Sequence, residues 1–478
     1  MSLTATKTSG FLLDGRWVSE GEPVEIRAPH DNSVVGVTYR AGPEHVEAAI
    51  RAAVRAFATT RKLPVYERQR VLRAVAQGIA DRREEFARVL ALEAAKPIKA
   101  ARVEADRAAF TFTVAAEEAA RIYGEWLPLD LQPAMAGRWG LLRRVPLGPV
   151  AAITPFNFPL NLVAHKYAPA IAAGCTVVHK PALQTPLCAL LLAELVHEAG
   201  WPAGALNVLP LSNEDAAPLV ADDRLKLLTF TGSSAVGWEL KRRAGKKRVA
   251  LELGGNAGVI IHSDADLDYA AERCVFGGFS YAGQSCISVQ RILVEQSVHE
   301  KFLAMLVSRV ESLKTGDPLD EATDVGCLIS EEAARRVETW IAEARTAGAR
   351  VLCGGTRRGA LLAPAVLTGT RPEQRINCQE VFGPVVTVEP YADFAAAIRA
   401  VNDSSYGLQA GVFTRDVKRI FSAYEELEAG AVVVNDVPTF RIDHMPYGGV
   451  KDSGMGREGL RYAIEEMTER KLLVMNLR

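Results

Sequence analysis

The sequence has only seven cysteines in 478 residues, and no two of them form a C-x-x-C pair. Their odd number and wide spacing argue against a disulfide framework or a structural zinc site, and we predict no metal. The sequence also lacks an uninterrupted apolar run of about 18 residues, so no transmembrane helix is predicted. Neither sign of charge dominates. The formal net charge of −1 gives no electrostatic reason to expect nucleic acid or an anionic membrane as a partner.

The first seven residues lack the apolar core of a signal peptide, so we expect a cytoplasmic protein. Hydrophobic residues make up 49% of the chain and charged residues 24%, which is ordinary for a globular protein. A chain of this length has room for two or three domains with substantial buried cores.

Helical periodicity predicts that roughly the first 125 residues are mainly helical. Apolar residues recur at helical spacing over residues 46–57 and from 67 to 92, and a further helix is expected over 99–122. Residues 125–146 instead contain two strand-like runs around a turn. Because such a hairpin is marginally stable alone, we expect it to pack on another subunit, with the run at 471–475 able to join it.

From Pro149 onwards, strand-like and helical runs alternate, which is typical of a parallel, doubly wound sheet. Three of the strand-like runs end near Thr154, Lys180 and Phe230. Ligands of such sheets bind at the carboxyl ends of the strands, so these residues are expected near a ligand. After Gly255 a second α/β pattern begins and continues to about residue 435.

Glu252 and Cys286 stand on either side of a segment with helical periodicity. A thiol is a soft nucleophile that can bond to a carbonyl carbon, and a carboxylate can then activate the water that frees the product. Either residue alone would be weak support for an enzyme. Most of the other cysteines are expected to be small, buried hydrophobic residues.

Six short motifs give these two residues a context. They are TPFNFP at 154–159, FTGS at 230–233, LELGG at 251–255, GQSC at 283–286, EVFGP at 380–384 and PYGGVK at 446–451. In this order they resemble the aldehyde dehydrogenase superfamily across essentially the whole chain, which is far more specific than one glycine-rich motif. Residues 435–446 are also similar to the lactaldehyde dehydrogenase-like branch.

The resemblance implies an α/β fold with three parts. A Rossmann-type dinucleotide-binding domain is expected over 1–124 and 147–255, and a second α/β domain with the catalytic residues over 256–446. A β-hairpin element for oligomerisation is expected over 125–146 and 466–478. It implies a homo-oligomer, either a dimer or a tetramer.

The resemblance also implies oxidation of an aldehyde to its carboxylate through a cysteine thioester. Cys286 matches the nucleophile, and Asn157 matches the side-chain donor that forms an oxyanion hole with the backbone N–H of Cys286. Glu252 matches the base that hydrolyses the thioester, and Lys166 matches a lysine near the catalytic centre. Relatives that transfer the acyl group to coenzyme A generally lack this glutamate, so Glu252 favours hydrolysis.

Two other classes of protein stay open as alternatives. A catalytically silent structural homologue would not need Cys286, Glu252 and Asn157 intact, as they are here. A thiolase-like or protease-like cysteine enzyme would need a histidine to activate Cys286, and no motif marks any of the eight histidines for that role.

NAD or NADP is the cofactor that the resemblance implies. Lys180 matches the lysine that contacts the adenosine ribose, and Glu380 the carboxylate that binds the nicotinamide ribose. Many NAD-preferring relatives have glutamate where this chain has Leu183, so a 2′-phosphate meets no repulsion and NADP is admissible. PLSNE at 210–214 also replaces a usual glycine-rich loop. The full predicted set is Ile153, Thr154, Pro155, Phe156, Lys180, Leu183, Phe230, Gly232, Ser233, Val236, Glu380 and Phe382.

The substrate pocket is matched by Arg107, Phe158, His165, Ser285, Ile287, Arg441 and Tyr447. Arg441 occupies a position where many relatives have an aromatic residue. Arg107 aligns with an arginine that binds phosphate in non-phosphorylating glyceraldehyde-3-phosphate dehydrogenases. If both guanidinium groups enter the pocket, the substrate is a small anionic or hydroxylated aldehyde.

Overall fold

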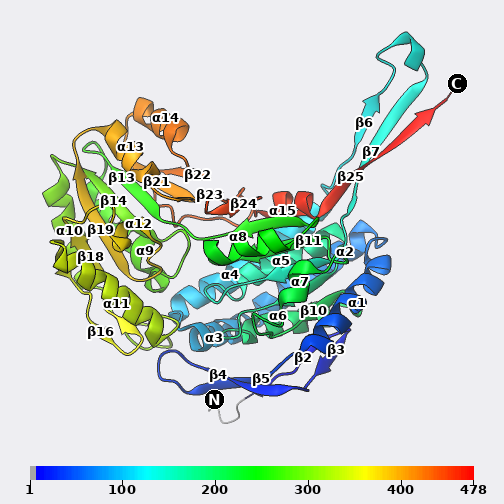
Figure 1. Ribbon diagram of the computed structural model, residues 1–478, viewed down its shortest axis with the longest axis horizontal. Helices are drawn as coiled ribbons and strands as arrows, with labels where there is room; N and C mark the ends of the chain where they lie inside the picture. The colour runs from blue at the N-terminus through cyan, green and yellow to red at the C-terminus, as the bar shows by residue number, and fades with distance from the viewer. Residues whose placement is uncertain (1–6, 478) are drawn as a thin grey trace.

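The computed structural model describes residues 7–477. The first six residues and Arg478, which the predicted domains include, lie outside this range. Two α/β lobes lie side by side, and a narrow arm of strands extends from the larger lobe (Figure 1). Within the described residues, no helix is long and apolar enough to cross a membrane.

The larger lobe is built on an eight-stranded sheet with the order β24-β12-β11-β8-β9-β10-β2-β3. Its five central strands run parallel, whereas β24, β2 and β3 pair antiparallel at the two edges. Residues of β8, β9, β10 and β11 are all buried, as expected for a parallel sheet covered on both faces. The strands are β2 (Phe11–Leu13), β3 (Arg16–Val18), β8 (Val150–Ile153), β9 (Val177–Lys180), β10 (Leu206–Val208), β11 (Leu227–Thr231), β12 (Arg248–Glu252) and β24 (Gly454–Met455).

Helices from both ends of the chain pack around this sheet and share one hydrophobic core. They are α1 (Pro43–Thr60), α2 (Val65–Asp81), α3 (Arg83–Ala94), α4 (Ile98–Ala119), α5 (Asn161–Ala173), α6 (Leu187–Glu198), α7 (Ala217–Ala221), α8 (Ser234–Arg243) and α15 (Leu460–Glu466). The apolar stripe predicted over 67–92 belongs to two helices rather than one, because the chain leaves helical geometry at Arg82.

The smaller lobe has its own core around a seven-stranded sheet with the order β15-β18-β19-β14-β13-β21-β22. Only β15 pairs antiparallel. Its strands are β13 (Ala257–Ile261), β14 (Val289–Glu295), β15 (Arg350–Cys353), β18 (Ala365–Thr368), β19 (Val385–Tyr391), β21 (Gln409–Phe413) and β22 (Ala431–Val434). Its helices are α9 (Leu267–Phe279), α10 (His299–Glu311), α11 (Glu331–Thr346), α12 (Arg375–Cys378), α13 (Phe394–Asn402) and α14 (Val417–Glu426).

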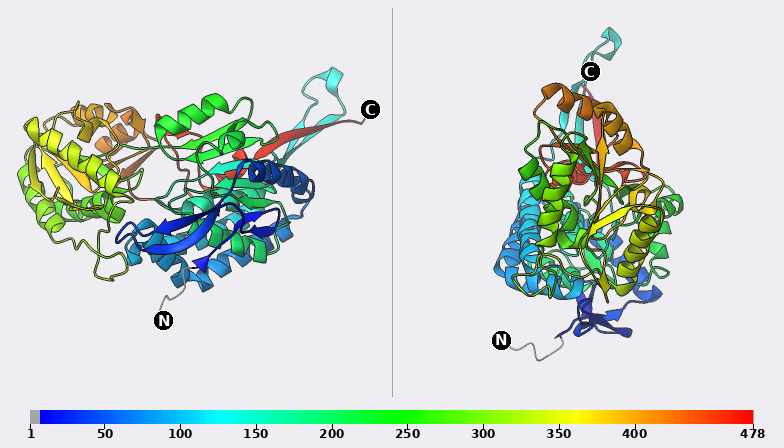
Figure 2. Two further views of the ribbon diagram at one scale, coloured as in Figure 1. Left: turned by 60° about the horizontal axis from the view of Figure 1, so that its bottom comes forward. Right: turned by 90° about the vertical axis from the view of Figure 1, so that its left-hand side faces the viewer.

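The arm is a three-stranded antiparallel sheet in which β7 (Arg138–Pro146) lies between β6 (Glu125–Pro128) and β25 (Thr468–Asn476). The turn between β6 and β7 contains the short helix η1 (Pro133–Met135). The arm projects away from both lobes in each view (Figure 2). Strand β25 is almost wholly exposed, including its apolar residues Leu472, Leu473 and Val474.

The mainly helical prediction was wrong for residues 7–40, which form β1 to β5. Strands β1 (Lys7–Thr8), β5 (Val34–Arg40) and β4 (Glu22–Arg27) make a separate three-stranded sheet. These strands are only two to seven residues long, so each gives a short pattern that is easily overlooked beside the long helical stretches that follow. The remaining short elements are β16 (Arg357–Arg358), β17 (Leu361–Leu362), β20 (Tyr406–Gly407), β23 (Val450–Lys451) and η2 (Ser280–Gly283).

Candidate active site

The carboxyl ends of neighbouring parallel strands bring the first group of predicted residues together. Ile153 pairs with Lys180 on one side and with Phe230 on the other, and Thr231 pairs with Glu252. The TPFNFP motif follows directly after β8, so it leaves the sheet at the same edge. This is the edge at which ligands of doubly wound sheets bind.

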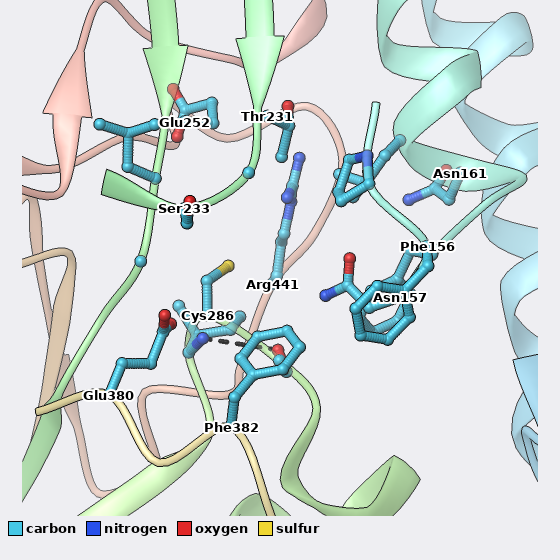
Figure 3. Close-up of a pocket in the computed structure, with 18 of the residues that line it drawn as sticks. Phe156, Asn157, Asn161, Thr231, Ser233, Glu252, Cys286, Glu380, Phe382 and Arg441 are labelled. Atoms are coloured by element: carbon cyan, nitrogen blue, oxygen red, sulfur yellow. Dashed lines mark hydrogen bonds between the residues drawn. The ribbon is translucent and has the colours of Figure 1, made fainter. Parts of the chain in front are cut away.

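A cavity of about 330 Å³ opens at this edge, between the two lobes (Figure 3). Most of the predicted catalytic and substrate residues line it, together with half of the predicted cofactor residues. They are Arg107, Pro155, Phe156, Asn157, Phe158, Gly232, Ser233, Glu252, Ser285, Cys286, Ile287, Glu380, Phe382, Arg441 and Tyr447. The predicted residues Ile153, Thr154, His165, Lys166, Lys180, Leu183, Phe230 and Val236 do not line this cavity.

A strained loop presents Cys286 to the cavity. Tyr281, Ala282 and Gly283 have consecutive positive φ angles of 49°, 52° and 69°. Such backbone is costly for residues other than glycine, so it persists only where the surroundings fix it. At Gly283 a Cβ atom would lie 2.1 Å from the carbonyl oxygen of Gly383, so this position has no space for a side chain.

The Cys286 sulfur lies 2.9 Å from the hydroxyl oxygen of Tyr447. Burial raises the pKa of the Cys286 thiol to about 12, and the hydrogen bond to Tyr447 lowers it only in part. The thiol is therefore protonated at neutral pH in this arrangement. Becoming a nucleophile requires that its proton be removed.

Asn157 lies across the cavity from the strand that carries Glu252 (Figure 3). Its Nδ2 donates to the carbonyl oxygen of Gln284 at 3.0 Å, and its buried Oδ1 has no hydrogen-bond partner among the described residues. An amide NH₂ group has two hydrogens, so one N–H of Asn157 holds the loop that carries Cys286, and within residues 7–477 the other is open to a ligand oxygen. The side chain is 5% exposed.

Glu252 is the last residue of β12 and is 5% exposed. Burial raises the pKa of its carboxyl group well above the ordinary value, and the negative charge of Glu458 raises it further. One of its oxygens, Oε2, is buried without a hydrogen-bond partner. A carboxyl group in such a state is suited to taking up a proton.

Glu458 is a residue of this site that the sequence patterns did not reveal. It accepts hydrogen bonds from Nζ of Lys166 and from Nη2 of Arg441, both at 2.7 Å. Arg441 also lies over the ring of Tyr447, with 3.8 Å between the guanidinium carbon and the ring centroid. Lys166 is thus placed behind the cavity wall and next to Arg441, whereas Arg441 itself lines the cavity.

Asp443 is the second residue that the sequence patterns missed. It accepts two hydrogen bonds from Arg107, at 2.7 and 3.1 Å, and one each from Nδ2 of Asn161 and Nε2 of His165, both at 2.9 Å. His165 is 1% exposed and is not among the residues that line the cavity, so its predicted contact with substrate stays a prediction. Asp443 lies within the segment 435–446, whose similarity to the lactaldehyde dehydrogenase-like branch was the only feature of the sequence that pointed to it.

Several groups at this edge of the sheet have the chemistry that a dinucleotide would need. Helix α8 begins after Ser233, whose side chain makes no capping bond, so the first amides of this helix are open to an anion. Glu380 accepts a hydrogen bond from the backbone N–H of Gly255 at 2.8 Å, and burial raises the pKa of Glu380 to about 7. The rings of Phe156 and Phe382 meet edge to face, 5.9 Å apart.

Lys180, Gly232 and Phe230 add further features to this edge of the sheet. Lys180 is 6% exposed and has a pKa lowered by burial, which favours a ligand that supplies negative charge or hydrogen-bond acceptors. Gly232 leaves room for the ring of Phe230, since a Cβ atom would lie 2.4 Å from it. Together the open helix terminus, the buried lysine and the carboxylate fit a dinucleotide.

Comparisons with known proteins agree with this geometry. The profile of the aldehyde dehydrogenase family matches residues 17–473. A 3-sulfolactaldehyde dehydrogenase from Priestia aryabhattai is 44% identical over 477 residues, which cover 100% of both chains.

Two solved structures have the same fold. Aldehyde dehydrogenase 21 from Physcomitrella patens, in complex with the reaction product succinate, superposes with a TM-score of 0.97 at 44% identity and 99% coverage of both chains. A glyceraldehyde-3-phosphate dehydrogenase from Methanocaldococcus jannaschii, complexed with NADP, gives 0.92 at 39% identity, covering 96% of this chain and 100% of its own. The chain belongs to the aldehyde dehydrogenase family, whose members oxidise aldehydes with NAD or NADP.

Proposed function

We propose that the enzyme oxidises a small aldehyde with an anionic or hydroxylated end, and releases the free carboxylate. The observation that carries this proposal is the cavity that Cys286, Asn157 and Glu252 line together with Arg107 and Arg441. Arg107 and Arg441 stand at that cavity as expected for residues that bind the far end of the substrate.

In the first step the thiol of Cys286 releases its proton to solvent water, and its sulfur bonds to the aldehyde carbon. The electron pair of the carbonyl π bond moves to the oxygen, which becomes an oxyanion. The free N–H of Asn157 and the backbone N–H of Cys286 would hydrogen-bond to that oxygen. The cofactor, when bound, supplies the acceptor for the hydride that leaves as the oxyanion collapses to a thioester.

In the second step Glu252 takes a proton from a water molecule, whose oxygen attacks the thioester carbon. The C–S bond breaks, the carboxylate is released and Cys286 leaves as a thiolate. Lys166 and Glu458 adjoin Glu252 and influence its proton affinity in opposite directions. A coenzyme A-acylating activity is disfavoured, because it has no use for a buried base at this place.

The residues proposed to hold the dinucleotide surround the carboxyl ends of β8, β9 and β11. The first amides of α8 after Gly232 and Ser233 suit a pyrophosphate, and Lys180 suits the adenosine ribose. Glu380 suits the nicotinamide ribose. Ile153, Thr154, Pro155, Phe156, Leu183, Phe230, Val236 and Phe382 complete the proposed contacts.

The substrate class is supported by the chemistry of the two arginines. Asp443 occupies Nε and Nη2 of Arg107 and leaves Nη1 for a ligand, and the buried Nε of Arg441 has no partner. The names of the similar proteins point the same way, since sulfolactaldehyde, succinate and glyceraldehyde-3-phosphate all carry a negatively charged group. Guanidinium groups recognise such anions well.

We also propose that the three predicted domains carry separate tasks. The eight-stranded sheet would bind the dinucleotide, the seven-stranded lobe would supply Cys286, and the arm would join subunits into a dimer or tetramer. The sheet includes β24, which the predicted domain ranges leave unassigned. A cytoplasmic location is supported by the free thiols of all seven cysteines.

A panel of aldehydes tests the substrate proposal. Lactaldehyde, succinic semialdehyde, glyceraldehyde-3-phosphate and propanal would each be assayed with NAD and with NADP, by the ultraviolet absorbance of the reduced cofactor. We expect kcat/KM for at least one charged aldehyde to exceed that for propanal by roughly tenfold or more. A clear preference for propanal would refute the proposed class.

A further inference from the structure

A buried ion pair lies behind the cavity wall. Nζ of Lys96 pairs with Oε2 of Glu104, and both side chains are 1% exposed. Neither residue lines the cavity. Because two buried charges are costly unless further contacts satisfy them, the other partners of this pair indicate what it holds in place.

On one side the pair binds the segment that carries Asn157. Nζ of Lys96 donates to the carbonyl oxygen of Asn157 at 3.0 Å. Oε1 of Glu104 accepts hydrogen bonds from the backbone N–H groups of Leu160 at 3.0 Å and Asn161 at 3.1 Å, where α5 begins. Both ends of the segment 157–161 are therefore fixed by one ion pair.

On the other side the pair contacts the loop that carries the nucleophile. The Lys96 ammonium lies 3.7 Å from the ring centroid of Phe158 and 4.3 Å from that of Tyr281, and these two rings meet edge to face. Tyr281 starts the left-handed run that leads to Cys286, and its hydroxyl donates to the carbonyl oxygen of Ala94 at 2.8 Å.

We propose that Lys96 and Glu104 are positioning residues for the reaction, because they fix the amide of Asn157 relative to Cys286. The inference rests on the proposed role of Asn157 as an oxyanion donor. The pair touches neither substrate nor cofactor. It acts through two backbone segments that meet at the hydrogen bond between Asn157 and Gln284.

The test compares two changes of the same kind. The double variant Lys96→Met, Glu104→Gln removes both charges together, so no unpaired charge stays buried, and the new amide side chain keeps an oxygen for the α5 amides. The matched control is Glu93→Gln. Glu93 is also buried and accepts from the backbone N–H groups of Leu187 and Cys188 at the start of α6, but among the described residues it makes no hydrogen bond to the segment 157–161.

The readout is the pre-steady-state burst of reduced cofactor, which reports formation of the thioester. We expect the double variant to lower the burst rate about 10- to 100-fold. This decrease should not exceed the decrease caused by Asn157→Ala. Cofactor affinity and the rate of Cys286 alkylation by iodoacetamide should stay within about twofold. Glu93→Gln should leave the burst rate nearly unchanged, whatever it does to the melting temperature.

Non-additivity separates positioning from simple loss of stability. In an Asn157→Ala background the double change should lower the burst rate by less than about twofold, since the amide that it positions is gone. The single variant Lys96→Arg keeps a cation beside an unchanged Glu104. Its burst rate should therefore be higher than that of the double variant. A full additional loss in the Asn157→Ala background would overturn the inference.

The two proposals fail in different ways. If Asn157→Ala itself leaves the burst rate unchanged, the proposed oxyanion role is wrong. If Asn157→Ala is slow but the Lys96 and Glu104 variant keeps a normal burst, only the positioning role is wrong. An equal decrease in burst rate in that variant and in Glu93→Gln would likewise rule out the positioning role.

Discussion

Glu252 and Glu458 belong to the same buried network, yet their surroundings act on them in opposite directions. Burial, followed by the charge of Glu458, raises the pKa of Glu252 well above its ordinary value. Burial also raises the pKa of Glu458, but the charges of Lys166 and Arg441 outweigh it and hold that pKa well below the ordinary range. One carboxyl group can therefore exchange a proton while the other stays charged, a separation typical of acid–base sites.

The protonation of Glu252 predicts a pH dependence. A base must be deprotonated to act, and the raised pKa of Glu252 means that its active form becomes more populated as pH rises from neutral. We expect the rate of thioester hydrolysis to increase with pH and acyl-enzyme to accumulate at lower pH. Single-turnover kinetics and intact-protein mass spectrometry would measure this. A rate that is flat across the neutral and alkaline range would contradict the role of Glu252.

Replacing the base should stop the reaction halfway. In Glu252→Gln the first step still has its nucleophile, but hydrolysis should slow by roughly 10²-fold or more. The trapped acyl group would appear as an increase in protein mass. In Cys286→Ala turnover should be lost, with cofactor binding retained in a fluorescence titration. A freely turning-over Glu252→Gln variant would remove the carboxylate from the mechanism.

Arg441, which lines the cavity, gives a prediction about substrate specificity. Arg441→Ala should raise KM for charged aldehydes by about tenfold, because a buried charge-assisted hydrogen bond is lost, and leave KM for propanal nearly unchanged. Glu458 loses a partner in this variant, so the melting temperature must be measured alongside. Equal effects on charged and uncharged aldehydes would show that Arg441 does not bind substrate.

At the scale of elements, the two lobes meet where β12 ends. Gly254 and Gly255 follow Glu252 there, and a Cβ atom at Gly255 would lie 2.0 Å from the carbonyl oxygen of Cys286. A Cβ atom at Gly254 would lie 2.6 Å from the carboxylate of Glu380. The absence of side chains therefore lets the strand end, the nucleophile loop and Glu380 approach one another.

This contact predicts that Gly255→Ala displaces Cys286. Since a misplacement of about 1 Å can cost on the order of 100-fold in rate, we expect kcat to fall about 10- to 100-fold. Gly316→Ala is a suitable control, because there the nearest atom to a new Cβ is a threonine hydroxyl at 3.3 Å. Steady-state kinetics would measure kcat of both variants. A Gly255→Ala enzyme with full activity would show that the loop can shift without cost.

The sequence predicted the alternating α/β elements because buried parallel strands are short apolar runs, as in β8 and β11. It did not reveal the N-terminal strands, because each is only two to seven residues long and shows little of its period. The resemblance of the six motifs to the aldehyde dehydrogenase family predicted the residues around Cys286. The partners of the arginines were hidden, because Arg107 meets Asp443 across 336 residues of chain and only folding brings them together.

At the scale of the whole molecule, the arm presents apolar surface that the described residues leave uncovered. Leu473 and Val474 are each 53% exposed, and Trp126 is 62% exposed. Exposed apolar strands are a common site of subunit contact.

Lysines placed on the exposed apolar residues of the arm should therefore weaken the contact between subunits. We expect Leu473→Lys with Val474→Lys to give a smaller species than the parent enzyme, measured by light scattering after gel filtration. Val417→Lys on α14 is the control, because Val417 is also exposed, at 63%, but lies on the opposite lobe. A parent enzyme that is monomeric would overturn the proposed role of the arm.

The place of β24 has a consequence for how the protein is made. Gly454 pairs with Glu252, so the strand that ends in the proposed base acquires its outer neighbour from a segment that follows the smaller lobe in the sequence. During synthesis the sheet edge beside Glu252 stays open until β24 has left the ribosome. The larger lobe is therefore completed only after the whole of the smaller lobe has been synthesised.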